Sequence, residues 1–419
     1  MTNRPVKAAL LCGALLLAAC KPQAADQKAG ERPAPATAEA TERLLEQLVT
    51  AKPGDVIRIP EGFYSLDRSL SLSSPGVTIR GAGMDRTILS FKGQIAGAEG
   101  LLVTGGNFLI EDLAIEDSKG DALKINGVEN VIIRRVRTEW TNGPDTGNGA
   151  YGIYPVQTRN VLIDGSIAIG ASDAGIYVGQ SRDVVVKNSR AEFNVAGIEI
   201  ENTVNADVFD NVATNNTGGI LVFNMPNLPA VGHTTRVFRN RIFANNTGNF
   251  GAKGTAVASV PAGSGIVINS NDLVEIFDND IAGNATANII ISSYFSTGYM
   301  TKEGVADSFD PWPQGIHVHG NRFRGGGDSP GTVELKALKT LKFGLNGRLP
   351  DILWDGFANP KPAKGTPAVL CVNNAPAEVL NADGPNKFRN PAISTAHACT
   401  LPPLPAAVVD TSWASSPGQ

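Results

Sequence analysis

The sequence has little charge, few aromatic residues, and little cysteine or histidine. Charged residues make up 18% of the 419 positions and aromatic residues 6%, with 4 cysteines and 4 histidines. A net charge of −4 provides no basic surface for nucleic acid, so no nucleic-acid partner is expected. The sequence also has no P-loop, no nucleophile elbow, no paired CxxC motif and no GxGxxG segment after a strand. The common nucleotide-binding and serine-hydrolase motifs are therefore absent.

No apolar run is long enough to cross a bilayer as a helix. The longest N-terminal run, Ala8 to Ala19, follows two basic residues and indicates a secretory signal over residues 1–20. Its end, Leu17-Ala18-Ala19-Cys20, resembles the bacterial lipobox. That resemblance implies lipidation of Cys20, and Lys21 after it implies transfer to the outer membrane. We therefore expect a lipid-anchored cell-envelope protein, in the outer membrane and facing the periplasm or the surface.

Removal of the signal would leave Cys371 and Cys399 as the only free pair of cysteines, because Cys20 would be acylated. An oxidising compartment favours joining such a pair, so the sequence predicts a Cys371–Cys399 disulfide.

A short apolar phrase recurs at intervals of 22 or 23 residues, beginning at Gly152, Gly175, Gly197 and Gly219. Each phrase is rich in β-branched residues, and asparagine-ended phrases follow. With 46 glycines and 26 prolines to make turns, the pattern predicts an all-β, single-stranded parallel β-helix.

Four regions follow from this reading: a lipoprotein signal (1–20), a flexible tether (21–37), the β-helix (38–325), and a C-terminal cap with a proline-rich tail (326–419). Leu44, Leu45, Leu48 and Val49 have helical spacing, which predicts a short helix covering the open N-terminal end of the stack.

Two internal columns of asparagine are expected at the turns. The first predicted column is 188, 211, 240 and 279, and the second lies near 194, 216, 246 and 284. The residue two positions before each asparagine of the first column, and before its continuation at Asn321, should face outward. These residues form a predicted strip of Val186, Phe209, Phe238, Phe277 and His319. We expect the tail to cover this strip, because exposed strips of phenylalanine are rare; the alternative is a platform for a sugar or a partner.

The opening of the repeat, Gly54 to Tyr64 and then Val77 to Gly83, resembles the right-handed β-helices of the pectate-lyase-like superfamily. The later phrases are similar to those of NosD-type proteins and mannuronan C5-epimerases. The segments 224–227 and 350–356 resemble a family of bacterial β-helix lipoproteins of unassigned function. The resemblance implies a right-handed parallel β-helix and does not indicate which reaction, if any, the protein catalyses.

Strand alternation places one polar cluster on an outer face. The candidate catalytic residues are Lys124, Tyr154, Tyr177, Glu199 and Glu201. The candidate substrate-binding residues are Asp121, Tyr151, Asp173, Gln180, Asn202, Asn224 and His233. Aromatic rings and carboxylates are the groups that bind sugars, and Lys or Tyr can serve as the base or acid of a uronate lyase or epimerase. Glu199 and Glu201 suit a hydrolase, although their spacing does not fix a retaining or inverting mechanism.

Two functional classes remain open, and the sequence does not decide whether the protein is an enzyme. One is a β-helix that modifies a polysaccharide as a lyase, epimerase or hydrolase, and the other is a non-catalytic scaffold that binds a glycan or an envelope protein. No cofactor is expected, calcium at Asp121, Asp145 and Asn148 being the alternative. No metal is assigned to His317 and His319, because no third ligand of the His or Cys type lies nearby in sequence.

Overall fold

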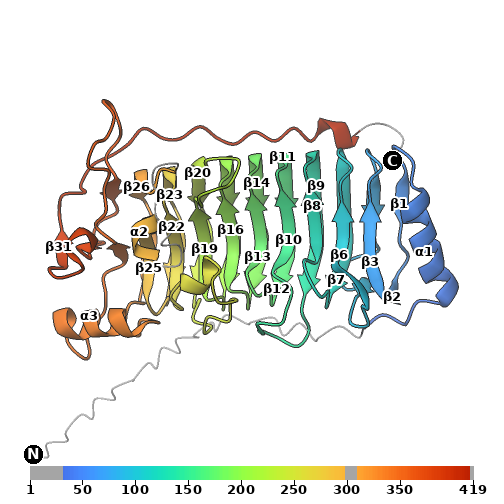
Figure 1. Ribbon diagram of the computed structural model, residues 1–419, viewed down its shortest axis with the longest axis horizontal. Helices are drawn as coiled ribbons and strands as arrows, with labels where there is room; N and C mark the ends of the chain where they lie inside the picture. Colours follow the sequence, from blue (N-terminus) through green and yellow to red (C-terminus); the bar gives the residue numbers. More distant parts are fainter. Residues whose placement is uncertain (1–31, 298–308, 416–419) are drawn as a thin grey trace, which may run out of the picture. The chain divides into compact units, whose positions relative to one another are not determined.

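The computed structural model describes residues 32–297 and 309–415. It begins with helix α1 (Ala38–Thr50), whose N-terminal turn is capped by Thr37: the Oγ1 atom accepts a hydrogen bond from the Ala40 N–H at 3.2 Å. Leu44 and Leu48 are buried against the first coils, whereas Val49, part of the predicted apolar face, is 84% exposed. Figure 1 shows α1 at the N-terminal end of the stacked strands, as expected of a cap.

Parallel strands stack into two sheets, joined coil by coil (Figure 1). The twelve-stranded one, here called sheet B, carries the predicted glycine-led phrases. Its strands are β3 (Arg68–Leu72), β6 (Ala96–Val103), β8 (Leu123–Asn126), β10 (Tyr151–Val156), β13 (Ala174–Gly179), β16 (Ala196–Glu201), β19 (Gly218–Phe223), β22 (Ser264–Asn269), β25 (Ala287–Ser292), β28 (Ile352–Trp354), β30 (Val379–Asn381) and the antiparallel β31 (Ala392–Ser394).

The nineteen-stranded sheet, here called sheet A, contains the asparagine-ended phrases. Its strands are β1 (Val56–Arg58), β2 (Gly62–Ser65), β4 (Thr78–Arg80), β5 (Thr87–Ser90), β7 (Phe108–Glu116), β9 (Glu129–Glu139), β11 (Arg159–Asp164), β12 (Ile167–Ile169), β14 (Arg182–Lys187), β15 (Arg190–Glu192), β17 (Val204–Phe209), β18 (Val212–Thr214), β20 (His233–Phe238), β21 (Arg241–Phe243), β23 (Asp272–Phe277), β24 (Asp280–Ala282), β26 (Gln314–His319), β27 (Arg322–Arg324) and β29 (Leu370–Asn373). The other elements within the described residues are α2 (Tyr294–Thr297), α3 (Val333–Phe343) and the short 3₁₀ turns η1 (Val257–Ser259), η3 (Gly384–Asn386) and η4 (Ser412–Ser415).

The interior is a column of aliphatic side chains, one layer per coil. Ile153, Ile176, Ile198 and Ile220 are fully buried and lie in register on successive strands of sheet B. This is the inward set that the alternation predicts. The parallel all-β fold expected from the repeat is therefore the observed fold.

One asparagine column runs through Asn211, Asn240, Asn279 and Asn321, each amide bonding to the next coil. The sequence analysis placed Asn188 at its start, and this is wrong by one residue. Lys187, not Val186, pairs with Phe209, and Ser189 donates its N–H to Asn211 Oδ1 at 2.9 Å.

Val186 is consequently buried in the core instead of standing in the outer strip. The reason for the slip is that Asn188 occupies the left-handed turn just before the column, with φ +51°. The second asparagine column shows a similar shift, since Asn245 and not Asn246 is its buried member.

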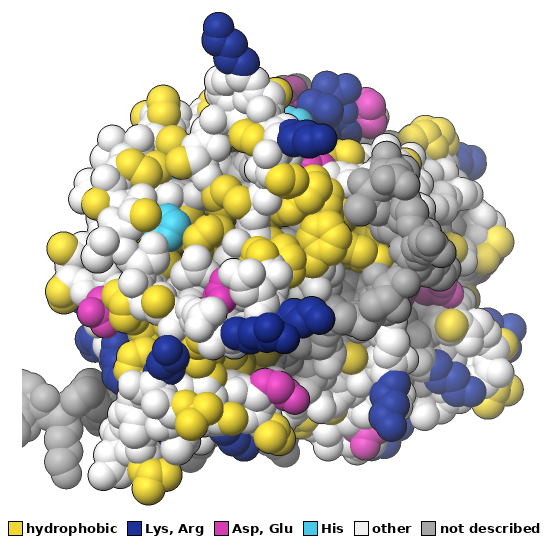
Figure 2. All heavy atoms as spheres, turned by 60° about the vertical axis from the view of Figure 1, so that its left-hand side comes forward, with side chains coloured by type: hydrophobic (Ala, Val, Ile, Leu, Met, Phe, Trp, Pro, Cys, Tyr) yellow, Lys and Arg dark blue, Asp and Glu magenta, His cyan; other side chains and the backbone are white. Residues whose placement is uncertain are grey.

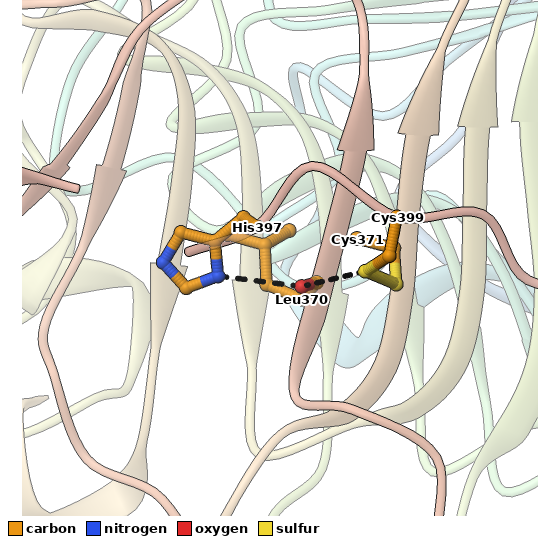
Figure 3. The surroundings of a disulfide bond; sticks show 4 residues. All are labelled: Leu370, Cys371, His397 and Cys399. Carbon is orange, nitrogen blue, oxygen red and sulfur yellow. Dashed lines mark hydrogen bonds between the residues drawn. A yellow bond between two sulfur atoms is a disulfide. The ribbon is translucent and has the colours of Figure 1, made fainter. Parts of the chain in front are cut away.

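The stack continues past Gly325, where the sequence analysis placed the start of the cap. Strands β28 and β30 extend sheet B, and β29 extends sheet A. Cys371 of β29 forms a disulfide with Cys399 (Figure 3). His397 lies beside it and contacts the Leu370 carbonyl oxygen at 3.3 Å. The disulfide thus fastens the start of the C-terminal tail to the last strand of sheet A.

Beyond the disulfide, the tail runs back along sheet A towards the first coils (Figure 1). Leu404 donates its N–H to Glu275 at 3.0 Å, and Asp410 exchanges two hydrogen bonds with Asn160. The rings of Phe209, Phe238, Phe277 and His319 stack with centroids 4.8 to 5.1 Å apart. Phe209 and the tail residues Val409 and Trp413 pack against one buried apolar cluster of sheet A, so the tail reaches the Phe209 end of this strip.

Within the described residues, no helix combines the length and apolar character needed to cross a membrane. The signal segment and Cys20 lie outside those residues.

Candidate functional site

The outer face of sheet B carries the predicted cluster. Strand register pairs Lys124 with Tyr154, Tyr177 with Glu199, and Gly179 with Glu201. Because the strands are parallel and in register, residues from separate coils become neighbours along a column. The predicted columns are the observed ones.

Three tyrosines form a compact aromatic group at the centre of this face. The Tyr151 ring lies 4.4 Å from that of Tyr154 and 4.6 Å from that of Tyr177, centroid to centroid. The Tyr154 and Tyr177 rings meet edge to face at 5.0 Å. Burial raises the pKa of Tyr154 to about 12 and those of the other two well above their usual value. The three phenol groups are therefore protonated at pH 7. They can donate hydrogen bonds, but they are not phenolate bases.

Three carboxyl groups adjoin the tyrosines. Burial, followed by the charges of Glu201 and Asp121, raises the pKa of Asp173 to about 8. Burial, followed by the charges of Asp173 and Glu201, also raises the pKa of Glu199 well above its usual range. Because like charges in a poorly solvated site do not all ionise together, the group retains protons at neutral pH.

The partners of these carboxyls differ. Glu201 accepts a 2.7 Å hydrogen bond from the Tyr177 hydroxyl, which lowers the pKa of Glu201 while burial raises it more strongly. The Tyr151 hydroxyl lies close enough to Asp173 to lower the pKa of that carboxyl, although burial and the neighbouring charges raise it more strongly. Glu199 is only 1% exposed, and its Oε2 atom has no hydrogen-bond partner in the described part of the chain. A buried acidic oxygen without a hydrogen-bond partner lowers the stability of the folded protein.

Lys124 borders the cluster on the N-terminal side. Its Nζ atom lies 3.3 Å from Asp121, 3.7 Å from Glu99, and 5.2 Å from the centre of the Tyr154 ring. Burial raises the pKa of Asp121, whereas Lys124 lowers it. The sequence analysis missed Glu99, which lies in the irregular part of β6 where the repeat is weak.

The insertion at residues 248–262 covers part of the cluster. Val257 and Val260 pack with Tyr177, Leu221 and Phe223 in one apolar group. Beside it lies a 660 Å³ groove, lined mainly by apolar residues of the later sheet B strands, the insertion and α3. Figure 2 turns the C-terminal end of the stack towards the viewer and shows hydrophobic side chains gathered on that face. The insertion therefore packs against the aromatic part of the cluster, with Tyr177 inside this apolar group and Tyr151 and Tyr154 at its edge.

The remaining predicted binding residues lie at the turn between sheets B and A. Gln180 lines a 470 Å³ pocket together with Gln157, Arg159 and Arg182. Asn202 bonds to the backbone of Met225 and Ala230 and so holds the loop that forms one wall of this pocket.

Two further predicted binding residues lie at the end of that loop. Asn224 bonds to the Gly232 backbone in both directions and closes the loop. His233 begins β20 in sheet A and contacts Thr234. The geometry gives Asn202 and Asn224 a role in holding the loop, and it places Gln180 and His233 apart from the tyrosines.

Residues 76–234 match a family model described as "Right handed beta helix region". Together with the strand pairing, this match makes the protein a right-handed parallel β-helix. The resemblance inferred from the opening coils and the repeats is confirmed at the level of the β-helix fold. No curated protein matches the sequence.

Solved structures with similar chain traces include enzymes that act on saccharides. The A-module of mannuronan C-5 epimerase AlgE4 from Azotobacter vinelandii aligns at 17% identity, covering 80% of this chain and 89% of its own, with a TM-score of 0.47. An alginate lyase from Paenibacillus sp. aligns at 16% identity, covering 68% and 93%, with a TM-score of 0.37. The DFA-IIIase of Arthrobacter chlorophenolicus aligns at 12% identity, covering 81% and 93%, with a TM-score of 0.44.

Proposed function

We propose that the outer face of sheet B, from β8 to β16, binds a glycan and that Asp173 donates a proton to it. The observation that supports this most directly is the packing of three tyrosine rings beside Asp173, a carboxyl whose pKa is raised to about 8 by burial and by neighbouring charges. Aromatic rings provide stacking surface for sugars, and hydroxyl and carboxyl groups bond to sugar hydroxyls. A protonated carboxyl is the group that protonates a glycosidic oxygen.

The charges of the face favour a neutral or amino-bearing glycan over a polyuronate. Lys124 is the cation in contact with the cluster, and it is already paired with Asp121 and Glu99. In the described part of the chain, no ion pair reaches Asp173, Glu199 or Glu201. β-Elimination and epimerisation require that the uronate carboxylate be neutralised. On this face a uronate carboxylate would lack a free cation to neutralise it.

A second candidate function is non-catalytic binding of a glycan or an envelope protein. The supporting observations are the packing of the 248–262 insertion on Tyr177 and the 1% exposure of Glu199, which leaves this carboxyl without access to solvent. In this case the acidic cluster shapes the face but transfers no proton.

The test is a panel of neutral, amino-bearing and uronate polymers, assayed for binding by calorimetry and for product by reducing-end release and absorbance of unsaturated uronate. We expect reducing-end release from a neutral or amino-bearing polymer. Asp173→Asn should lower that rate by about 100-fold or more while keeping binding, because general acid catalysis contributes about 10²–10⁴-fold. Asp278→Asn, at an exposed turn after β23, serves as the control.

The outcomes separate the candidates. Binding without product, unaffected by Asp173→Asn, leaves the non-catalytic function. Unsaturated product from a uronate polymer contradicts the charge argument, and the absence of both binding and product on every polymer removes the glycan proposal.

We further propose that the protein works in the cell envelope, anchored by lipid at Cys20. The support is the lipobox-like tetrapeptide and the disulfide, which suits an oxidising compartment. In a bacterial host fed an alkyne fatty acid, the protein should take up label, and Cys20→Ala should abolish it. Cys12→Ala, inside the same apolar run, should keep the label. Equal labelling of both variants would contradict the anchor.

A further inference from the structure

Two histidines and a glutamate converge on the outer face of sheet A, away from the tyrosine cluster. Register places Glu275 of β23 opposite His317 of β26, two neighbouring strands in Figure 1. His319 lies two residues on, on the same face of β26. One ligand-type atom from each of the three side chains lies within 4.8 Å of the other two.

The side chains are buried and incompletely bonded, which is unusual for a purely structural group. His317 is 7% exposed, and neither ring nitrogen has a hydrogen-bond partner among the described residues. Glu275 is 3% exposed. Its Oε1 lies 3.0 Å from His319 Nε2, and its Oε2 accepts the Leu404 N–H from the tail. Buried polar groups are normally paired, so a buried imidazole whose two ring nitrogens both lack a hydrogen-bond partner indicates a site for a ligand.

The surroundings hold two of the three groups in place. The His319 ring stacks on Phe277 at 5.1 Å and 4°, which fixes its plane. The tail N–H orients the Glu275 carboxylate from the side opposite His319, as an outer partner of a metal ligand does. Arg236, the cation on the preceding coil, is paired with Asp207 through two hydrogen bonds of 2.8 and 2.5 Å. Its charge is therefore already compensated.

We propose that Glu275, His317 and His319 form a site for a divalent transition metal ion such as Zn²⁺. Two imidazoles and one carboxylate are a donor set that Zn²⁺ uses, with a fourth position for water or another ligand. Ligand atoms around a tetrahedral zinc lie roughly 3.4 Å apart, so side-chain rotation within the present cluster suffices. Calcium does not fit, because it takes six to eight oxygens.

The signal for the third ligand was present in the sequence. Glu275 precedes Asn279 by the same four positions as His317 precedes Asn321, so the asparagine column aligns them. Glu275 is missed when only histidine and cysteine residues close to His317 in the sequence are considered, because it is a carboxylate and lies on the preceding coil.

The experiment is calorimetric titration of the EDTA-stripped full-length protein with Zn²⁺, with Ca²⁺ as a second titrant. We expect one Zn²⁺ per chain and no Ca²⁺ binding at this site. His317→Ala and Glu275→Gln should each lower Zn²⁺ affinity at least 100-fold; the glutamine keeps an acceptor for the tail N–H. His233→Ala, a partly buried histidine on the same sheet, should leave Zn²⁺ binding unchanged.

A second readout separates loss of the site from loss of the fold. Co²⁺ bound in place of Zn²⁺ should give a visible absorption band in the wild type and in His233→Ala, and none in His319→Ala, while circular dichroism of all three stays the same. Absence of Zn²⁺ binding to the folded wild type overturns the proposal. So does Zn²⁺ binding that survives in both His317→Ala and Glu275→Gln.

Discussion

Asn240→Ala is expected to destabilise the protein by on the order of 4 kcal/mol, because it leaves several buried polar groups without partners. The Oδ1 atom of Asn240 accepts from both the backbone N–H and the side-chain amide of Asn211 at 3.0 Å. Its Nδ2 donates to the Val208 carbonyl at 2.9 Å and to Asn279 Oδ1 at 3.0 Å. Alanine removes all four bonds in the middle of a continuous column, where each amide also polarises the next.

The matched control is Asn188→Ala. Asn188 ends the same kind of phrase, but it is exposed, and within the described residues its side chain bonds only to Asp164. We expect a cost of about 1 kcal/mol, from placing alanine at a left-handed backbone position. Urea unfolding followed by circular dichroism measures both. Equal costs for the two variants would mean that the column does not carry the stability assigned to it.

This pair of variants also shows how far the sequence determines the fold. The repeat spacing and the alternation of Ile153, Ile176 and Ile198 identify the coils and their inward faces, because a solenoid forces each repeat to bury the same positions. The repeat does not fix the register at turns. There an asparagine can either enter the column or adopt the left-handed conformation just before it, as Asn188 does.

The sequence predicts the central residues of the candidate site, but it does not predict their electrostatics. Strand register alone brings Lys124, Tyr154 and Glu199 to one face. The burial that raises the pKa of the neighbouring Tyr177 involves the 248–262 insertion, whose Val257 and Val260 pack in the same apolar group as Tyr177. An insertion has no repeat partner in the sequence, so its position cannot be read from periodicity.

Replacing Asp173 with asparagine is expected to stabilise the protein at high pH and to have little effect at low pH. The pKa of Asp173 is about 8 in the folded protein, raised first by burial and then by the charges of Glu201 and Asp121. In the unfolded chain the same carboxyl ionises near pH 4. Between those values the folded state holds a proton that the unfolded state has released, so the stability that depends on Asp173 falls as pH rises through that window.

Asparagine has nearly the same shape as aspartate and has no charge to be desolvated. The gain of Asp173→Asn over wild type should therefore grow from near zero at pH 4 to on the order of 3 kcal/mol at pH 9. It should level off above pH 8. Thermal or urea unfolding at a series of pH values measures the difference.

Asp272→Asn gives the matched comparison in sheet A. Burial, with the charge of Asp310, raises the pKa of Asp272 to about 7, so its gain should level off about one pH unit earlier than that of Asp173→Asn. A flat pH profile for Asp173→Asn, beside a rising one for Asp272→Asn, would show that Asp173 ionises normally in the folded protein. The proposed proton donor would then be lost, because a carboxylate that is already ionised at pH 7 has no proton to transfer to a glycan.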